Sequence, residues 1–432
     1  MMQLFGSGLI SLWLKLAGVQ VMPLDAWEVL SLTSSPGFVL LRDPNSAGAT
    51  TVKQYLKGLA TKKTVTANQG VWIQSGPLLL ANNQGTTPLP AASLTKIATS
   101  LAALKTWGPD HQFETLIAAT GTVKNRVLYG DLVIQGGGDP FFIWEDAIAL
   151  ARSLKTLGIA RVTGNLVITG NFAMNYESKP VLAGQMLKQG LNGDLPSFVK
   201  FEYLQNSLRT PQPQVAIAGN VQVRGITPYT ATKQILLIRH RSLPLAQIIK
   251  EMNIYSNNKM AQILADSLGG AQVVQELAAK TSGVPQSEIQ LVNGSGLGVE
   301  NRLSPRAVCA ILGAIQQEIL PYHLSLADLF AVAGRDRRGT IQARHIPADT
   351  VVKTGTLDRV SSLAGVMPTR DRGLVWFAIV NQGSDVPDFR SRQDQLLQSL
   401  LHQWQVAPIV PATVTPNSRN DDEDRDEIVY RR

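Results

Sequence analysis

The sequence is poor in the residues that build disulfide bonds and metal sites. Its 432 residues include a single cysteine, Cys309, and five histidines that stand far apart along the chain. One cysteine excludes an intrachain disulfide and a cysteine-built zinc site. The histidines show no H-E-x-x-H or comparable ligand spacing. We therefore expect no metal and no other cofactor.

The sequence also lacks an apolar run long enough to cross a membrane. The run from Leu4 to Leu14 has 11 residues, whereas a spanning helix needs about 20. Its length suits the apolar part of a signal peptide, but no basic residue precedes it and no A-x-A site follows it. We expect residues 1–21 to be either a weak signal segment or an N-terminal helix of the mature protein, and the sequence leaves both open.

Charged residues are few, at 17% of the chain, and their balance is positive, with a formal net charge of +8. From Pro411 onward four arginines stand against six acids, so this end carries −2 and the rest of the chain +10. No dense Lys/Arg run of the kind that binds nucleic acid occurs, and the densest cluster lies at residues 335–338. We expect no nucleic-acid partner, since a moderate positive charge by itself keeps a surface soluble.

The residues that are abundant support a large folded core. Apolar residues make up 44% of the chain, and its length suggests two or three domains, or one domain with a large insertion. The apolar patterns predict strands at residues 71–80, 114–119, 126–135, 161–169, 214–224 and 373–382, and helices at 91–106, 144–157, 246–268 and 304–318. Residues 411–432 are polar and acidic, which predicts a disordered tail.

Ser93 and Lys96 belong to the first of three short patterns, Ser93-Leu94-Thr95-Lys96. Residues three apart lie on one face of a helix, so the two side chains point the same way. The surrounding residues are apolar, and burial of a lysine lowers its pKa toward neutrality. A neutral lysine can take the proton of a serine hydroxyl and make it a nucleophile without histidine. Alone, the pattern also fits an ordinary helix start with a surface-reaching Lys96.

The second pattern is Ser256-Asn257-Asn258. From a short loop, Asn258 can both donate to and accept from a peptide amide, and Ser256 can relay a proton. The alternative is a helix N-cap, for which both serine and asparagine are well suited.

The third pattern is Lys353-Thr354-Gly355-Thr356, which follows two valines. A glycine in a strand lets another backbone or a ligand come close. Lys353, Thr354 and Thr356 can supply positive charge and hydroxyls to a substrate carboxylate. The backbone N–H of Thr356 can also join that of Ser93 in an oxyanion hole. The alternative is an edge strand with exposed polar residues.

In this order, S-x-x-K, S-x-N and K-T-G form the penicilloyl serine transferase signature. Further matching stretches are Gly130-Asp131-Leu132, Gly136-Gly137-Gly138-Asp139-Pro140, Asn293-Gly294-Ser295-Gly296-Leu297 and Asn301-Arg302-Leu303-Ser304-Pro305. From about Gly70 to Gln382 the chain resembles the D-alanyl-D-alanine carboxypeptidase/endopeptidase group of low-molecular-mass penicillin-binding proteins (DacB type). Asn293 and Asn257 depart from it, because they stand where many members have aspartate, which leaves fine specificity open.

The resemblance implies an α/β fold with a β-lactamase/transpeptidase-like domain, in which an antiparallel sheet lies between helices, and with a mostly β inserted domain. We expect the catalytic domain to comprise residues 22–107 and 241–410. The insertion would then span residues 108–240, and the tail residues 411–432.

The resemblance also implies a serine-type D-Ala-D-Ala carboxypeptidase or endopeptidase of cell wall biogenesis. Such an enzyme cleaves peptidoglycan stem peptides through an acyl-enzyme and is inhibited by penicillins and other β-lactams. The implied catalytic residues are Ser93, Lys96, Ser256 and Lys353, and the implied substrate-binding residues are Asn258, Thr354, Gly355 and Thr356. The implied location is periplasmic or otherwise extracytoplasmic, with loose membrane or cell-wall association. An anionic cell wall would then be the counterpart of the positive charge.

Two alternatives stay open on the same scaffold. One is a serine β-lactamase-like hydrolase, which in its fast form needs a deacylating glutamate in an E-x-x-L-N element after S-x-N. The nearest match, residues 202–206, has the wrong spacing and precedes Ser256, so we expect slow release of a penicilloyl adduct. The other alternative is a non-catalytic cell-wall-binding protein. The sequence also leaves open the oligomeric state and the balance between carboxypeptidase and endopeptidase action.

Overall fold

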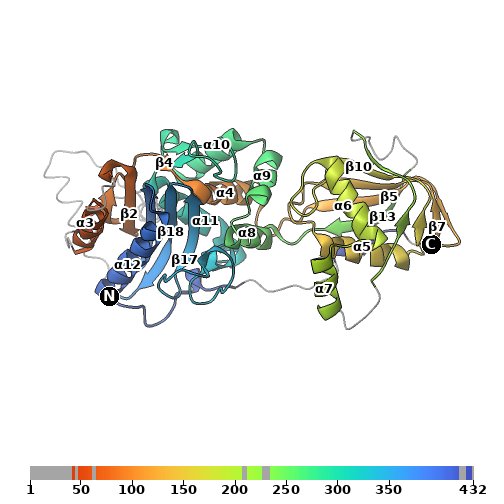
Figure 1. The fold of residues 1–432 in the computed structure, drawn as a ribbon. Coiled ribbons are helices and arrows are strands. Elements are labelled where there is room, and N and C mark those ends of the chain that lie inside the picture. The colour runs from red at the N-terminus through yellow and green to blue at the C-terminus, as the bar shows by residue number, and fades with distance from the viewer. Residues whose placement is uncertain are drawn as a thin grey trace, which may run out of the picture.

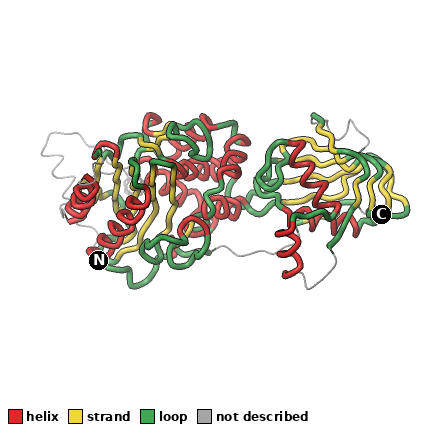
Figure 2. Tube along the Cα trace, in the orientation of Figure 1, coloured by secondary structure: helices red, strands yellow, loops and turns green. Residues whose placement is uncertain are grey.

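The computed structural model describes residues 41–43, 47–60, 65–206, 212–225, 234–417 and 425–430. Its elements gather in two groups, a larger one with a seven-stranded sheet and a smaller one with a six-stranded sheet (Figures 1 and 2). The stretch expected to be a signal segment or an N-terminal helix, residues 1–21, lies outside the described residues.

The seven-stranded sheet forms the centre of the larger group. In sheet order, its strands are β1 (Leu41–Arg42), β3 (Leu78–Asn83), β2 (Gln69–Ser75), β19 (Gly373–Gln382), β18 (Val360–Thr369), β17 (Val351–Leu357) and β16 (Ala331–Val332). Neighbouring strands are antiparallel except β1 and β3, which run parallel. The predicted antiparallel sheet is thereby confirmed.

Both faces of this sheet are buried. Successive side chains of each strand point to opposite faces, and each face packs against its own hydrophobic core. In β19, Val375, Phe377 and Ile379 contact one hydrophobic core, whereas Trp376 and Ala378 contact another. Helices α3 (Ala47–Ala60) and α12 (Val386–Trp404) cover the first face, and α4 (Thr95–Trp107) and α11 (Pro305–Ile319) cover the second. The sheet therefore lies between two helical layers, as the sequence predicted (Figure 1).

Further helices and a small sheet complete the larger group. They are α8 (Leu245–Ile254), α9 (Asn258–Ser267), α10 (Ala271–Ser282), and the strands β14 (Ile289–Gln290), β15 (Arg302–Leu303) and β4 (Leu89–Pro90). The prediction of one continuous helix over residues 246–268 is wrong, since α8 and α9 are separate. They are separate because Ser256 has a φ of 53°, which lies in the left-handed region and interrupts a right-handed helix.

In the described residues, the smaller group is built from two sheets and three α-helices. Its six-stranded sheet contains β12 (Val221–Val223), β10 (Leu166–Asn171), β8 (Leu132–Gly137), β5 (Glu114–Ala119), β13 (Ile235–Arg241) and β20 (Asp426–Ile428), and its four-stranded sheet contains β11 (Ala216–Ile217), β9 (Arg161–Val162), β7 (Val127–Tyr129) and β6 (Thr122–Lys124). The helices are α5 (Trp144–Thr156), α6 (Pro180–Asn192) and α7 (Ser197–Asn206). Since the sequence predicted only the first of these helices, this part is more helical than expected.

We propose that residues 108–240 form a domain inserted between the two parts of the catalytic domain, residues 22–107 and 241–410. No described strand within residues 108–240 belongs to the seven-stranded sheet. A separate hydrophobic core supports the same division, because side chains of α5 and α6 pack on β5, β8 and β10.

The polar tail, predicted to be disordered from residue 411, is ordered in the parts that the structure describes. A short 3-10 helix, η8 (Ala412–Val414), follows the larger group, and Val414 is fully buried. The hydroxyl of Ser325 donates a hydrogen bond to the carbonyl of Thr415 at 2.7 Å. Hydrogen bonds and a buried apolar side chain therefore offset the entropy lost on ordering.

The last described segment, β20, returns to the smaller group and pairs antiparallel with β13. Asp426 lies buried there, with Oδ1 at 2.7 Å from Nδ1 of His240, and Oδ2 accepts from the Ser153 hydroxyl at 2.6 Å. Arg425 pairs with the buried Asp146. Acidic composition alone suggested disorder, but Arg425 and Asp426 both have partners that are distant in sequence.

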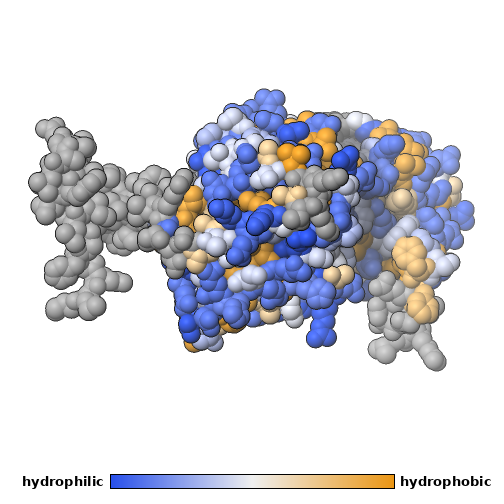
Figure 3. All heavy atoms as spheres, turned by 60° about the vertical axis from the view of Figure 1, so that its left-hand side comes forward, coloured by the Kyte–Doolittle hydropathy of each residue, from blue (hydrophilic) through white to orange (hydrophobic). Residues whose placement is uncertain are grey.

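The surface is mostly polar on the face shown in Figure 3, where hydrophobic residues form small separate groups. Within the described ranges, no helix is long and apolar enough to cross a membrane.

Candidate active site

Ser93 lies in a tight turn at the start of α4. The turn is a 3-10 helix, η2 (Ala92–Leu94), and Ala92 before the serine has a φ of 49°. The backbone N–H of Ala91 donates to the carbonyl of Asn301 at 2.9 Å, which ties the turn to the loop before β15. From residue 89 to residue 104, Ser93 is the one residue that is not buried. The turn therefore presents this hydroxyl at the surface of a rigid core.

Lys96 lies fully buried next to Ser93. Its Nζ is 2.9 Å from Oγ of Ser93, 2.7 Å from Oδ1 of Asn258 and 2.7 Å from the carbonyl oxygen of Ser295. Burial strips water from the ammonium form and lowers the pKa of Lys96 from 10.5 to about 7. A neutral amine can donate its two N–H groups to the amide and carbonyl oxygens. Its lone pair then faces the Ser93 hydroxyl.

The break between α8 and α9 holds the second pattern. Asn257 is the N-cap of α9, and its side chain accepts from the backbone N–H groups of Lys259 and Met260. Aspartate caps helices equally well, so asparagine at this position preserves the local structure. With the cap formed by Asn257, Ser256 and Asn258 on either side of it are free to face the cavity.

Lys353 projects from β17 toward this break. Its Nζ donates to Oγ of Ser256 at 3.0 Å and to the carbonyl oxygen of Thr354 at 2.8 Å. The side chain is only 1% exposed. Burial, and secondarily the charge of Lys96, hold the pKa of Lys353 well below its usual value. Lys353 is therefore an internal partner of Ser256 and is not a surface charge.

Gly355 lets β17 pass very close to the Ser93 turn. A Cβ atom at this position would lie 2.2 Å from Oγ of Ser362, 2.9 Å from the backbone N of Ser93 and 3.0 Å from the carbonyl oxygen of Ala91. Strand β16 pairs only with Val351 and Val352. Beyond those two residues, the edge of β17 is open next to Ser93.

The groups described above surround one cavity of about 410 Å³. It is lined by Ser93, Ser256, Asn258, Thr340, Arg344, Thr354, Thr356 and Arg390. The hydroxyl of Thr354 bonds that of Thr340 at 2.7 Å, and Nη2 of Arg390 donates to Oγ1 of Thr356 at 2.9 Å. The cavity thus combines a serine–lysine pair with several hydroxyls and two guanidinium groups.

Five of the eight residues predicted for the site line this cavity, and Lys96 and Lys353 hydrogen-bond to lining residues. The eighth, Gly355, lies between Thr354 and Thr356 and next to the Ser93 turn. The sequence did not single out Arg344 and Arg390, which come from a loop before β17 and from α12. No local pattern marks these arginines, since folding alone brings them beside β17.

Asn293, which departs from the resembled sequence pattern, shapes the loop that contacts Lys96. Its Oδ1 accepts from the backbone N–H groups of Ser295 and Gly296 at 3.0 and 2.8 Å, and its Nδ2 donates to the carbonyl of Leu297 at 2.7 Å. The amide thus satisfies both ends of the turn, which fixes the carbonyl of Ser295 that Lys96 contacts.

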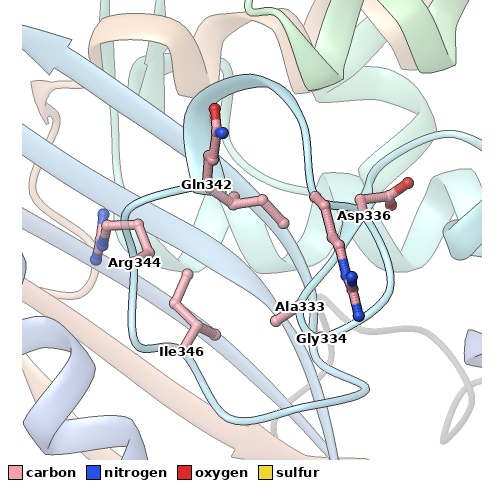
Figure 4. A pocket seen from close by; sticks show the side chains of 8 residues that line it. Ala333, Gly334, Asp336, Gln342, Arg344 and Ile346 are labelled. Carbon is pink, nitrogen blue, oxygen red and sulfur yellow. The ribbon is translucent and has the colours of Figure 1, made fainter.

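A second cavity of about 350 Å³ adjoins the first and is shown in Figure 4. It is lined by Ala333, Gly334, Asp336, Arg337, Ile341, Gln342, Arg344 and Ile346. Arg344 borders both cavities. The second cavity contains no serine, threonine or lysine, so the reactive groups belong to the first.

In the part of the chain that the structure describes, no group of three or more His, Cys, Asp or Glu could hold a metal ion. Cys309 is free and buried in α11, and burial raises the pKa of its thiol. The buried thiol lies outside the cavity lining.

Comparison with known families matches residues 53–180 and 201–403 to the family described as D-Ala-D-Ala carboxypeptidase 3 (S13). The chain is similar to the D-alanyl-D-alanine carboxypeptidase DacB of Haemophilus influenzae, with 23% identity over 410 residues, which covers 73% of this chain and 85% of that protein. It is also similar to the D-alanyl-D-alanine carboxypeptidase of Actinomadura sp., with 24% identity over 460 residues, covering 83% and 82%.

Among solved structures, the fold is similar to that of a penicillin G-acylated predatory endopeptidase from Bdellovibrio bacteriovorus. The TM-score is 0.68 at 20% identity, and the match covers 79% of this chain and 96% of the other. At this level of identity the likeness concerns the fold, which agrees with the transpeptidase-like domain expected from the sequence.

Proposed function

Since the chain belongs to the D-Ala-D-Ala carboxypeptidase 3 (S13) family, we propose that it works by acyl transfer through Ser93, with Lys96 as the general base. It is a serine peptidase of the hydrolase class that acts on D-Ala-D-Ala peptides. The observation that carries the assignment of residues is the 2.9 Å contact between Ser93 and a buried lysine whose pKa burial lowers to about 7.

In the acylation step, Oγ of Ser93 attacks the carbonyl carbon between the two D-alanines of a peptidoglycan stem peptide. Neutral Lys96 takes the hydroxyl proton as the new C–O bond forms. We assign the oxyanion hole to the backbone N–H groups of Ser93 and Thr356, because Gly355 lets β17 approach the serine turn so closely.

Collapse of this intermediate breaks the C–N bond, and the leaving amine must gain a proton. We assign the relay to Ser256, whose hydroxyl is held by Nζ of Lys353 at 3.0 Å. Asn258 positions the peptide amide while its Oδ1 accepts from Lys96 at 2.7 Å. D-Alanine then leaves, and Ser93 carries the acyl group as an ester.

The leaving amine takes the proton of Lys96 through Ser256, which returns Lys96 to its neutral form. Lys96 then accepts a proton from the water that attacks the ester, and this proton passes to Oγ of Ser93 as the ester C–O bond breaks and the shortened peptide leaves. The same acyl-enzyme arises when the leaving amine belongs to a cross-linked second peptide. Carboxypeptidase and endopeptidase action can therefore use the same catalytic residues. Thr354 and Thr356 face the position of the carboxylate that follows the cleaved bond.

We also propose that β-lactams acylate Ser93 and inhibit the enzyme, since the penicillin ring presents a reactive amide in the same setting. The related endopeptidase acylated by penicillin G supports this proposal. Because peptidoglycan lies outside the cytoplasm, we propose an extracytoplasmic, and in a diderm cell periplasmic, site of action. Loose contact with the wall or membrane would follow from the substrate's location.

Labelling with a fluorescent penicillin tests the nucleophile and separates the enzyme from a non-catalytic wall-binding protein. Wild type should be labelled and Ser93→Ala should not, because the acceptor oxygen is gone. The matched control is Ser287→Ala, at an exposed serine outside the cavity lining, which should label like wild type. Absence of labelling in wild type would contradict the proposal.

Two further measurements address the remaining alternatives. Mass spectrometry of products from purified muropeptides separates loss of one D-alanine from splitting of dimers. The penicilloyl adduct should persist, whereas rapid catalytic hydrolysis of penicillin would favour a β-lactamase-like hydrolase.

A further inference from the structure

The cavity must recognise a carboxylate, but its two lysines are not available for that task. Lys96 is fully buried and faces Ser93, Asn258 and Ser295. Lys353 is 1% exposed, and its contacts are Ser256 and the carbonyl of Thr354. Burial disfavours the charged form of both amines, and the contacts of both face the protein interior. The expectation that Lys353 supplies the positive charge therefore does not fit its position.

Two other cations line the same cavity, Arg344 and Arg390. Arg344 is already neutralised, because its Nη2 lies 2.7 Å from Oδ1 of Asp394, its Nε lies 3.1 Å from both oxygens of that carboxylate, and both side chains are 7% exposed. A guanidinium in a two-pronged ion pair has little affinity left for another carboxylate. Arg344 therefore lines the cavity as half of an internal ion pair and is not the group that binds a substrate carboxylate.

Arg390 is the remaining cation and differs from Arg344 in its partners. It is exposed on the second turn of α12, and its side chain donates one hydrogen bond among the described residues, from Nη2 to Oγ1 of Thr356 at 2.9 Å. The nearby acids have other partners, since Asp394 pairs with Arg344 and Asp388 pairs with Arg392. Among the described residues, none of the ion pairs involves Arg390.

The direction of the hydrogen bond between Arg390 and Thr356 leaves donors available to a substrate. The arginine donates and the threonine oxygen accepts, so the threonine proton remains free to donate to a third group. The other N–H groups of the guanidinium also remain free to donate. The two side chains thus form a pair of donors that can hold the two oxygens of one carboxylate.

We propose that Arg390, from α12, is the specificity residue that supplies the positive charge for the carboxylate next to the cleaved bond, acting together with the hydroxyl of Thr356. The carboxylate of the terminal D-alanine, or its counterpart on the second strand of a cross-link, lies between them. With the carboxylate held there, the other end of the same substrate residue, the scissile amide, has its carbonyl carbon next to Oγ of Ser93. This inference rests on the proposed function and adds the group that selects an acidic substrate end.

The test compares a peptide ending in D-Ala-D-Ala with the same peptide carrying a C-terminal amide. For Arg390→Gln, kcat/KM on the free acid should fall about ten- to hundredfold, because one charged hydrogen-bonded contact is lost. The value on the amide should change little, so the preference for the acid collapses. Arg390→Lys keeps the charge without the planar fork and should recover part of the preference.

The acylation rates by benzylpenicillin and its methyl ester, followed by intact mass, give a second pair of substrates with and without a carboxylate. Arg390→Gln should slow the acid and spare the ester. Complete labelling after long incubation shows that the variant is folded and that its serine reacts. The matched control is Arg392→Gln, two residues away, where the arginine pairs with Asp388 outside the cavity. This control should keep the wild-type preference.

The outcomes distinguish a failure of the role of Arg390 from a failure of the proposed function. If wild type reacts but Arg390→Gln loses acid and neutral substrates equally, or loses neither, the role of Arg390 is wrong and the proposed function stands. If wild type cleaves no D-Ala-D-Ala peptide and takes up no penicillin, both are wrong.

Discussion

Lys96 and Lys353 carry the same functional group, and each is buried beside one serine of the cavity. Lys96 contacts Ser93 at 2.9 Å, and Lys353 contacts Ser256 at 3.0 Å. Burial lowers the pKa of both, and for Lys353 the charge of Lys96 acts in the same direction. At the scale of single residues, the site is thus two serine–lysine pairs in a water-poor interior. The Lys96 pair can hold or release a proton near neutral pH, and burial disfavours the charged form of Lys353.

The pH dependence of acylation tests this assignment. The pKa of Lys96 is lowered to about 7, so the basic, neutral amine predominates above that pH and the inactive ammonium below it. We expect the acylation rate with benzylpenicillin to fall about tenfold per pH unit below pH 7 and to level off above it.

The control for this profile is Lys96→Arg. A guanidinium stays protonated over the whole range, so the rate should drop about 10²–10⁴-fold and the step near pH 7 should vanish. A wild-type rate that stays constant down to pH 5 would show that another group is the base.

At the scale of elements, the site depends on how closely β17 and the η2 turn approach each other. Backbone atoms of Ala91 and Ser93 lie within 3.0 Å of where a Cβ of residue 355 would be, and the Ser362 hydroxyl is nearer still. The Ser362 hydroxyl also donates to the carbonyl of Ala91 at 2.8 Å, which ties β18 to the same turn. These contacts couple the position of β17 to that of the η2 turn.

Gly355→Ala should push β17 away from the Ser93 turn. Because the proposed oxyanion donors sit on these two elements, a displacement of a few tenths of an ångström should lower the acylation rate by about tenfold or more. Rates of penicilloyl formation measured by mass spectrometry provide the test. Gly225→Ala is the matched control, since nothing lies within 4 Å of its Cβ position. Equal rates for the two variants would refute the close-contact argument.

At the scale of the whole molecule, two separate segments of the chain contribute to the smaller group. The chain builds that group between residues 108 and 241 and returns to it at the end of the described residues with β20. The return is held by buried polar contacts of Asp426 with His240 and Ser153. Exposed contacts of Glu427 with Arg239 and Arg241 add to it. The last strand therefore covers one edge of the six-stranded sheet.

Two neighbouring substitutions test how this strand is held. Asp426→Ala leaves Nδ1 of His240 and the buried Ser153 hydroxyl without their hydrogen-bond partner and should lower the free energy of unfolding by about 1–3 kcal/mol for each of these groups. Glu427→Ala removes two exposed ion pairs, with Arg239 and Arg241, and should lower the free energy of unfolding by at most about 1 kcal/mol. Thermal unfolding of both variants gives the comparison. Equal effects would mean that β20 is held by its backbone pairing alone.

The sequence by itself identified the groups that are linked by local spacing. Ser93 and Lys96 share a helix face because they are three residues apart, and the glycine of the K-T-G pattern indicated a close approach. The alternating and continuous apolar runs also predicted β5, α5, α11 and β19 at their observed positions. These features depend on the local period of the backbone, which sequence order carries directly.

Only the tertiary structure decided which charges reach the cavity and where the tail goes. Lys353 looks in sequence like an exposed cation, but packing buries it against Ser256, while Arg390 comes from a distant helix. The acidic end resembles a disordered tail in sequence, but in the fold its buried Asp426 contacts His240 and its Arg425 pairs with the buried Asp146 of α5. Burial and partners far away along the chain set these properties, because desolvation and ion pairing depend on position in space and not on order in sequence.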